Sequence, residues 1–271
     1  MKRARGAALL LVMWLVLLLS GLVAGYAMAA RIESMQGNGI ARGVVAGEAA
    51  RAGVEYAAAH LLDPDPTRRW VADGRARRLL FDGMQVDVEV RDESGKIDLN
   101  NAGTELLAAL FVELGEPRDH AAALAGAIAD WRDPDALSQP AGGAEDPAYA
   151  AAGLAWGAKD APFGTVAELE QVLGMRPALF TAAAPHLTVF SGASMPDAAS
   201  ADAIVRAAMG IDAGGAGEAP NAGSGTYSID SRARLADGRS AHLSVVLRMG
   251  GNGLPGSTYT PLRWQAGGAQ P

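Results

Sequence analysis

Five carboxylates form the one group in this chain whose residue types and spacing suit a metal site. They lie close together on a stretch rich in Pro and Gly: Asp130, Asp133, Asp135, Glu145 and Asp146. Carboxylates at short intervals on irregular backbone suit Ca²⁺, a hard cation that takes about 6–8 oxygen ligands. Without a cation, the same carboxylates would repel one another. The spacing is not that of an EF-hand, and a solvated acidic loop after a helix is the alternative.

A second pattern with chemical meaning is a glycine fingerprint near the C-terminus. Gly251, Gly253 and Gly256 match the G-x-G-x-x-G motif of dinucleotide-binding proteins. The motif requires a following helix, which Pro255 and Pro261 prevent. We therefore interpret this segment as a flexible hairpin loop.

Neither Ser224 nor the four histidines form a catalytic pattern. Ser224 lies between two glycines, but a nucleophile elbow would need Gly where Ala222 stands. The four histidines are scattered, with none beside another residue that we expect to be a ligand. We interpret them as ordinary surface or core residues, and we expect the protein not to be an enzyme.

The composition narrows the function further. The 271 residues are 49% hydrophobic, enough for one sizeable core or two smaller ones. The absence of Cys excludes disulfides, thiolate metal sites and a Cys nucleophile. The net charge of −7 argues against nucleic acid as a partner, because phosphate binding needs the opposite sign.

The N-terminal segment is typical of a membrane anchor. A basic head containing Lys2, Arg3 and Arg5 precedes an uncharged apolar run from Ala7 to about Ala30. About 20 apolar residues in a helix cross the hydrocarbon core of a bilayer. The basic head should stay in the cytoplasm, which places the rest of the chain on the opposite side.

Three interpretations of this anchor remain open from its residues alone. The sequence Ala27-Met28-Ala29 offers a secretory signal peptidase site, although the apolar run is longer than such signals usually have. An uncut signal anchor is the second. The third follows from Arg5-Gly6 directly before the apolar run, which resembles a prepilin leader cut after Gly6 to leave Ala7 as the new N-terminus.

Periodicity predicts an α+β fold behind this anchor. A helix should continue the anchor from Ile40 to about Leu62, with Gly37 and Gly39 marking a kink or a short unwound section. Alternating apolar residues predict antiparallel strands early and late in the chain. The expected strands are 84–91, 227–235 and 243–249, followed by an edge strand at 259–264.

The middle of the chain is rich in Ala and Leu at helical spacing. We expect an all-α domain inserted into the sheet, with a Gly-rich linker leading back to it at 210–225. The expected helices are Thr104–Leu114, Asp119–Trp131, Thr165–Leu173, Pro177–Ala184 and Ser200–Met209. Thr165 with Glu168 makes a capping box.

Together, these features resemble the minor pseudopilin K of type II secretion systems. The resemblance rests on segments that follow one another in the family's order. These are Arg5–Leu10, Glu48–Glu55, Asp92–Ala102, Asp130–Asp133, Gly143–Asp146 with Tyr149, Tyr227–Gly238 and Trp264. Most pseudopilins carry Glu at the fifth mature position, which is Leu11 here, and the K family resembles this chain in lacking it.

The resemblance implies a non-enzymatic structural subunit, which we expect at the tip of a periplasmic pseudopilus. It favours the prepilin leader, a calcium site in the helical domain and a single-pass location in the bacterial inner membrane. The implied domains are leader 1–6, transmembrane helix 7–30, pilin-like helix and first strands 31–99, inserted all-α domain 100–215 and C-terminal strands 216–271.

The implied partners are the other minor pseudopilins, the major pseudopilin and the prepilin peptidase, with no nucleic acid. The alternative function is that of an exported soluble calcium-binding or substrate-binding protein with a cleaved secretory signal.

Overall fold

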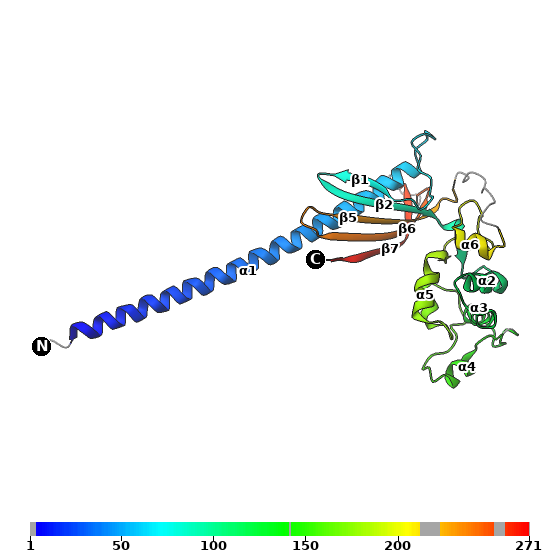
Figure 1. Cartoon of the computed structure of the whole chain (residues 1–271), viewed down its shortest axis with the longest axis horizontal. Helices are drawn as coiled ribbons and strands as arrows, with labels where there is room; N and C mark the ends of the chain where they lie inside the picture. Colours follow the sequence, from blue (N-terminus) through cyan, green and yellow to red (C-terminus); the bar gives the residue numbers. More distant parts are fainter. Residues whose placement is uncertain (1–3, 141, 212–222, 252–257, 271) are drawn as a thin grey trace.

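The longest element of the structure is its N-terminal helix. The structure, a computed structural model, describes residues 4–140, 142–211, 223–251 and 258–270. Helix α1 (Ala4–Leu61) runs from the N-terminus into a sheet without a break (Figure 1). It stays helical through Gly37 and Gly39, so the expectation of a kink or unwound section there is wrong. The Arg239 guanidinium donates to the carbonyl of Gly39 at 2.8 Å and holds this part of α1 against the sheet.

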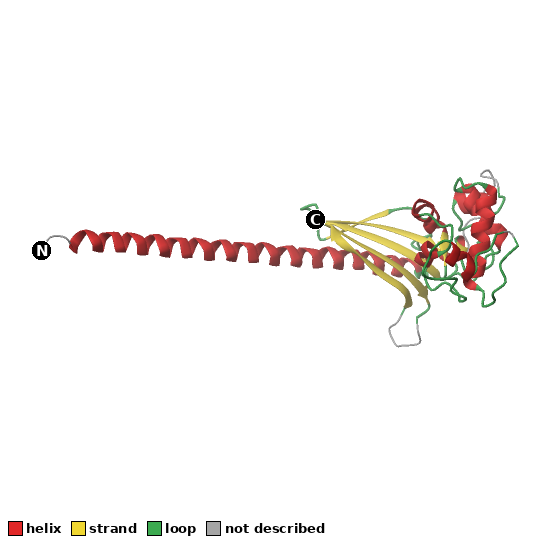
Figure 2. Ribbon diagram, turned by 90° about the horizontal axis from the view of Figure 1, so that it is seen from below, coloured by secondary structure: helices red, strands yellow, loops and turns green. Residues whose placement is uncertain are grey.

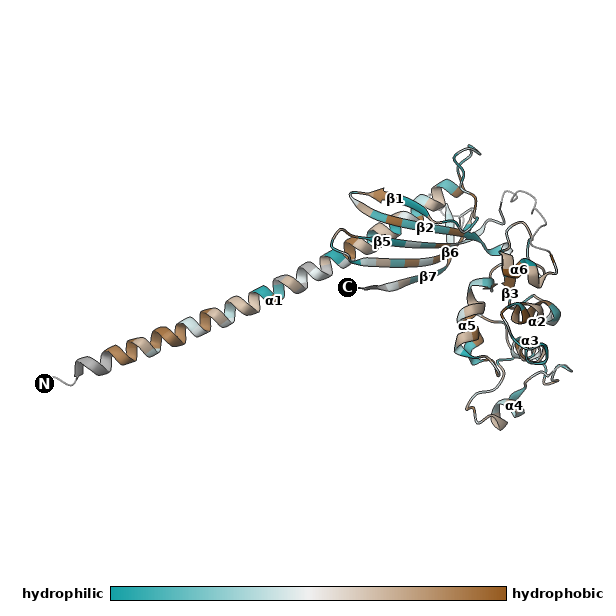
Figure 3. Ribbon diagram, viewed as in Figure 1, coloured by the Kyte–Doolittle hydropathy of each residue, from teal (hydrophilic) through white to brown (hydrophobic). Residues whose placement is uncertain are grey.

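The N-terminal part of α1 is long and apolar enough to cross a membrane. The candidate span is Leu9–Glu33, and none of its best window is buried inside the molecule. Figure 3 shows this part as a mostly hydrophobic rod that extends away from the sheet. Apolar side chains with no protein partner fit an anchor in lipid.

The sheet has five antiparallel strands in the order β1-β2-β5-β6-β7. The strands predicted from alternation are confirmed, but β1 was not expected and β7 extends further than predicted. Their bounds are β1 (Arg77–Phe81), β2 (Met84–Asp92), β5 (Thr226–Arg234), β6 (Ser240–Met249) and β7 (Tyr259–Gln270).

The second half of α1 lies along one face of this sheet (Figure 2). Small residues on α1 allow the close approach, and Val86, Val88 and Val90 of β2 are fully buried beneath the helix. Gly53 lies at the tightest point. An added Cβ there would overlap the Ser231 hydroxyl and lie 2.8 Å from a methyl group of Val86.

We predict that Gly53→Ala destabilises the sheet domain by about 1–3 kcal/mol, the usual cost of overpacking. Gly47→Ala is the matched control, because Gly47 is on the same helix with nothing within 4 Å of an added Cβ. Ala is a better helix former by about 1 kcal/mol, so this control should be neutral or stabilising. Urea unfolding of both variants measures the difference, and equal stabilities would contradict the packing.

A helical domain is inserted between β2 and β5, at the end of the sheet far from the N-terminus (Figure 1). It has its own hydrophobic core. Its helices are η1 (Glu93–Gly95), α2 (Thr104–Glu113), α3 (Arg118–Arg132), α4 (Asp146–Ala151), η2 (Val166–Gln171), α5 (Pro177–Ala183), η3 (Ala184–His186) and α6 (Ala203–Ala208). Two short parallel strands, β3 (Ile97–Asp98) and β4 (Leu187–Thr188), also belong to it.

The domain departs from the prediction in four details. The strands β3 and β4 make it not strictly all-α, and the short helix α4 was not expected. The segment at Thr165 is a 3-10 helix, although its capping box is present. Helix α6 begins at Ala203, not Ser200, because the Asp202 carboxylate accepts the backbone N–H groups of Ile204 and Val205. Of the expected linker, 212–222 lies outside the described residues.

The segment Asp98–Ala102 acts as a structural turn at the entrance to this domain. Asp98 accepts hydrogen bonds from the backbone N–H groups of Asn100 and Gly192, both at 2.8 Å. The Asn100 amide binds both the N–H and the carbonyl of Phe163, at 2.7 and 2.9 Å. These residues therefore fix the chain path.

Candidate metal site in the helical domain

The acidic residues lie on the loop between α3 and α4. Asp133 directly follows α3, and Glu145 directly precedes α4. The structure brings one carboxylate oxygen of Asp133, Asp135 and Glu145 within 4.8 Å of one another. Thus three of the five predicted ligands converge, although ten or more residues separate the loop's two ends in sequence.

Two oxygens of this group are buried without a hydrogen-bond partner among the described residues. They are Asp133 Oδ1 and Glu145 Oε1. A buried carboxylate oxygen without a partner is costly, and a bound cation would remove that cost. The Glu145 side chain is almost completely buried, whereas Asp135 is exposed and leaves a route from solvent.

Electrostatics also favour a cation at this place. Burial raises the pKa of Glu145, and the negative charge of neighbouring acids, Asp130 and Asp160 first among them, raises it further. The folded chain therefore holds a proton there more tightly than the unfolded chain does. Once the carboxyl groups are ionised, their burial and repulsion oppose folding unless a positive charge balances them. The sequence analysis did not single out Asp160, whose place beside Glu145 arises only from the fold.

Asp130 has a different position from the one predicted. It lies on the last turn of α3, is fully buried and accepts the backbone N–H of Gln139 at 3.1 Å. Burial raises the pKa of its carboxyl group. Gly143 packs so closely that an added Cβ would overlap the Asp130 carboxylate. Asp130 thus fixes the loop through its hydrogen bond to Gln139 and is not one of the three converging carboxylates.

Asp146 also lies outside the converging group. It is exposed at the first residue of α4, and its carboxylate lies against Gly157, where an added Cβ would overlap it. The prediction of five ligands is therefore reduced to a group of three.

The three carboxylates fit Ca²⁺ in chemistry. They are hard oxygen donors, two of their oxygens have no other partner, and the exposed side of the site can admit water. Asp133, Asp135 and Glu145 would hold the ion. Backbone carbonyls and water would complete a shell of about 6–8 oxygens. Such an ion would supply charge balance and cross-link the two ends of the loop.

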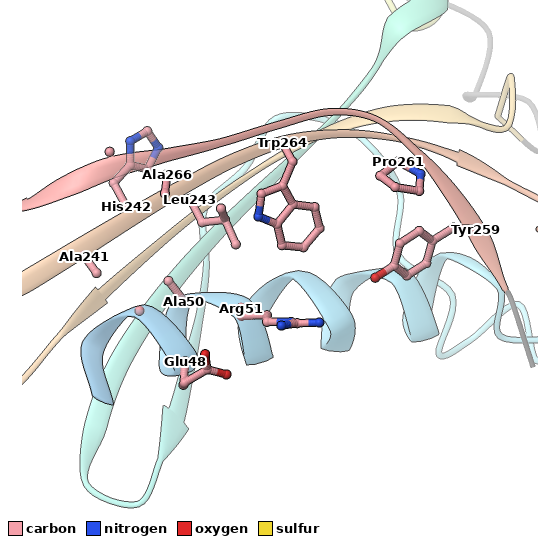
Figure 4. A pocket seen from close by; sticks show the side chains of 12 residues that line it. Glu48, Ala50, Arg51, Ala241, His242, Leu243, Tyr259, Pro261, Trp264 and Ala266 are labelled. Carbon is pink, nitrogen blue, oxygen red and sulfur yellow. The ribbon is translucent and has the colours of Figure 1, made fainter. Parts of the chain in front are cut away.

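A separate groove of about 470 Å³ lies between α1 and β7 (Figure 4). Arg51 of α1 lies over the ring of Trp264, 5.8 Å from its centroid, and Tyr259 donates to Glu55 at 2.7 Å. Burial, and then the bond to Glu55, raises the pKa of Tyr259 to about 12, so this hydroxyl keeps its proton at neutral pH. These contacts fasten β7 to α1.

The other sequence patterns have structural positions. Ser224 binds the Asp92 carboxylate at the base of the helical domain. Three histidines each pair with one carboxylate: His120 with Glu116, His186 with Asp202 and His242 with Asp230. The fourth, His60, binds the carbonyl of Arg68. In the parts of the chain that are described, no histidine joins a group of potential metal ligands. Most of the predicted glycine loop, 252–257, lies outside the described residues.

Gly6 and Ala7, the predicted processing residues, lie in the first turns of α1. The surroundings of the Ala7 side chain lie outside the described part. Cleavage between Gly6 and Ala7 stays a prediction.

One family model agrees with the resemblance seen in the sequence. The family model for type II secretion system protein K matches residues 86–192, from β2 to just beyond β4. Residues 86–192 belong to the protein K family of type II secretion systems. The resemblance predicted from the sequence is thereby confirmed over this region, which holds most of the helical domain and the whole acidic loop.

A solved structure has the same fold. One chain in the crystal structure of the GspK-GspI-GspJ complex from the enterotoxigenic Escherichia coli type 2 secretion system matches with a TM-score of 0.59 at 14% identity. The match covers 88% of this chain and 99% of the other. The predicted fold class, a pilin-like sheet on a long helix with an inserted helical domain, is confirmed. No curated protein matches the sequence.

Proposed function

We propose that this chain is a minor pseudopilin that forms the tip of the periplasmic pseudopilus of a type II secretion system and supports protein export across the outer membrane. The observation that carries the proposal is the protein K match over residues 86–192. That region contains the junction between the pilin-like sheet and the inserted domain, which distinguishes this fold from a plain pilin.

The long helix supports an inner-membrane location. Its candidate span, Leu9–Glu33, follows the basic N-terminal head, so the positive-inside rule leaves Met1 in the cytoplasm. The sheet and helical domain would then lie in the periplasm. We propose a structural role without catalysis, with the prepilin peptidase acting on this chain before assembly.

The proposed partners are other minor pseudopilins and the major pseudopilin. The similar solved structure is a complex of GspK with GspI and GspJ, and an equivalent assembly would use the exposed apolar surface of α1. Calcium at Asp133, Asp135 and Glu145 is the proposed cofactor, supported by the convergence and the unpartnered oxygens described above.

Gly6→Val should leave the full-length precursor in the membrane. A peptidase that cuts after Gly6 must accept this residue closely, and a branched side chain would obstruct it. Gly21→Val is the control, because it makes the same change in the same helix, where nothing lies within 4 Å of an added Cβ. Mass spectrometry of the membrane-bound chain measures the cut.

N-terminal sequencing of the mature chain separates the proposal from its alternative. Ala7 as first residue supports a pseudopilin. A first residue of Ala30 or Arg31 would support an exported soluble calcium-binding or substrate-binding protein with a discarded signal. Normal maturation of Gly6→Val would rule out the prepilin leader.

A further inference from the structure

The helical domain and the sheet have separate hydrophobic cores. Among the described residues, none belongs to both core clusters. The chain crosses between the domains at two places that lie side by side, because Asp92 at the end of β2 pairs with Tyr227 near the start of β5. A narrow neck between two cores usually permits relative domain motion. In this chain, the neck contains hydrogen bonds and an ion pair to two buried carboxylates, Asp92 and Glu93.

The first of these contacts joins the outgoing and returning segments. Asp92 is 3% exposed, and its carboxylate accepts the backbone N–H of Ser94 at 2.9 Å and that of Ser224 at 2.8 Å. The hydroxyls of both serines bind the same carboxylate. One buried charge therefore ties the segment that leaves the sheet to the one that returns.

The second contact runs from the helical domain to the sheet. Glu93 is 1% exposed and pairs with the Lys96 ammonium at 2.5 Å. It also accepts the Thr188 hydroxyl of β4, while Lys96 donates to Ser228 of β5 at 2.9 Å. The chain Thr188–Glu93–Lys96–Ser228 thus connects the two domains through an ion pair whose carboxylate is buried and whose ammonium is partly buried.

A third contact supports the neck from the segment before α6. The N–H of Asp197 donates to the carbonyl of Ser94 at 2.8 Å. Gly95 lies so close to the backbone of Ser200 that an added Cβ would overlap it. This segment is therefore packed closely against the outgoing chain at Gly95.

Bending the neck would separate buried charges from their partners. A buried carboxylate that loses a hydrogen bond or its ion-pair partner is destabilised far more than an exposed one. We propose that Asp92, Glu93, Lys96, Thr188, Ser224 and Ser228, which we name the junction latch, hold the helical domain and the sheet as one rigid body. The latch replaces the apolar interface that usually immobilises two domains. This inference rests on the neck alone and does not depend on the proposed function.

Pulsed dipolar spectroscopy of the full-length chain in detergent tests the latch. The chain has no Cys, so spin labels attach only where Cys is introduced. Arg232→Cys on the exposed face of β5 and Glu113→Cys at the end of α2 place one label on each domain. The expected result is one narrow distance distribution, no wider than label rotation allows.

Lys96→Met should broaden this distribution by about twofold or more, because it leaves Glu93 buried without its ion-pair partner. Thr188→Val is a milder second variant that keeps both charges and removes the hydroxyl, and it should broaden the distribution less. If circular dichroism shows that Lys96→Met does not fold, the distance distribution of Thr188→Val is the test of the latch.

Lys159→Met is the matched control. Lys159 pairs with Glu168 at 2.6 Å, wholly within the helical domain, so its loss should leave the distance distribution unchanged. A broad distribution in the unmodified chain would overturn the proposal. A distribution that stays narrow in every folded latch variant would overturn it as well.

Discussion

Calcium should raise the melting temperature of this protein by roughly 5 to 10 °C relative to the same protein in chelator. A ligand that binds only the folded state adds RT ln(1 + [L]/Kd), about 2.7 kcal/mol at 100 times Kd. The gain is expected to come from the loop between α3 and α4, where Asp133 and Glu145 have buried oxygens without partners among the described residues. Scanning calorimetry with calcium and with chelator measures the shift.

The double variant Asp133→Asn, Glu145→Gln should abolish this shift. In chelator it should also melt higher than the parent, because it removes the Glu145 charge, which burial and neighbouring acids disfavour, and the Asp133 charge, which adds to that repulsion. These opposite effects separate a cation site from a loop that the substitutions merely damage.

Asp146→Asn is the control for the calcium experiment. Asp146 is a neighbouring acid in sequence but is exposed and outside the converging group, so the variant should keep the full shift. An unchanged melting temperature in the parent protein would mean that the loop is solvated and holds no ion.

The sequence predicted the elements whose pattern of apolar residues follows from a single neighbouring layer, either lipid or one packed element. The apolar run and its helical continuation predicted α1, and strict alternation predicted β2, which has α1 on one face and solvent on the other. By contrast, the sequence of β1, Arg-Arg-Leu-Leu-Phe, shows no alternation of polar and apolar residues, although its exposure in the structure alternates and Leu80 is 77% exposed. Pairing with β2, not its own pattern, makes it a strand.

The metal site could be predicted only in outline. Spacing identified the acidic segment, but it could not distinguish a carboxylate that binds an ion from one that supports the loop. Asp130 faces the interior because it lies on the buried side of α3, whereas Asp135 lies on exposed backbone two residues after Asp133. Asp160 approaches Glu145 from a later loop, and no local pattern connects them.

Labelling should find this subunit only at the tips of pseudopili, and overproducing it alone should give no long filaments. By family analogy, the fifth-position Glu of a pseudopilin pairs with the amino terminus of a neighbour inside the apolar filament core. Leu11 cannot provide that charge. An unpaired buried charge costs several kcal/mol, so a subunit with Leu at this position is expected to have no neighbour above it. Immunogold electron microscopy of pseudopili checks the location.

The fold offers a second, independent obstacle to growth beyond this subunit. The helical domain covers the end of the sheet opposite the N-terminus (Figure 1) and, if the junction latch holds, cannot swing aside. Because Asp92 and Tyr227 are paired across the neck, a short turn can replace the domain without moving the sheet. The substitution Leu11→Glu and the excision of the helical domain, with a short turn in its place, can therefore be tested separately and together.

Either obstacle alone should suffice to keep the subunit at the tip. Leu11 leaves the amino terminus of a neighbour without a charge partner, and the helical domain blocks the sheet of the next subunit. Each single change should consequently leave the gold at tips, and only the chain with both changes should also appear along the shaft. Circular dichroism must first show that the excised variants keep their sheet. Regular labelling along the shaft by the unmodified chain would disprove the tip assignment but would not affect the family match over residues 86–192.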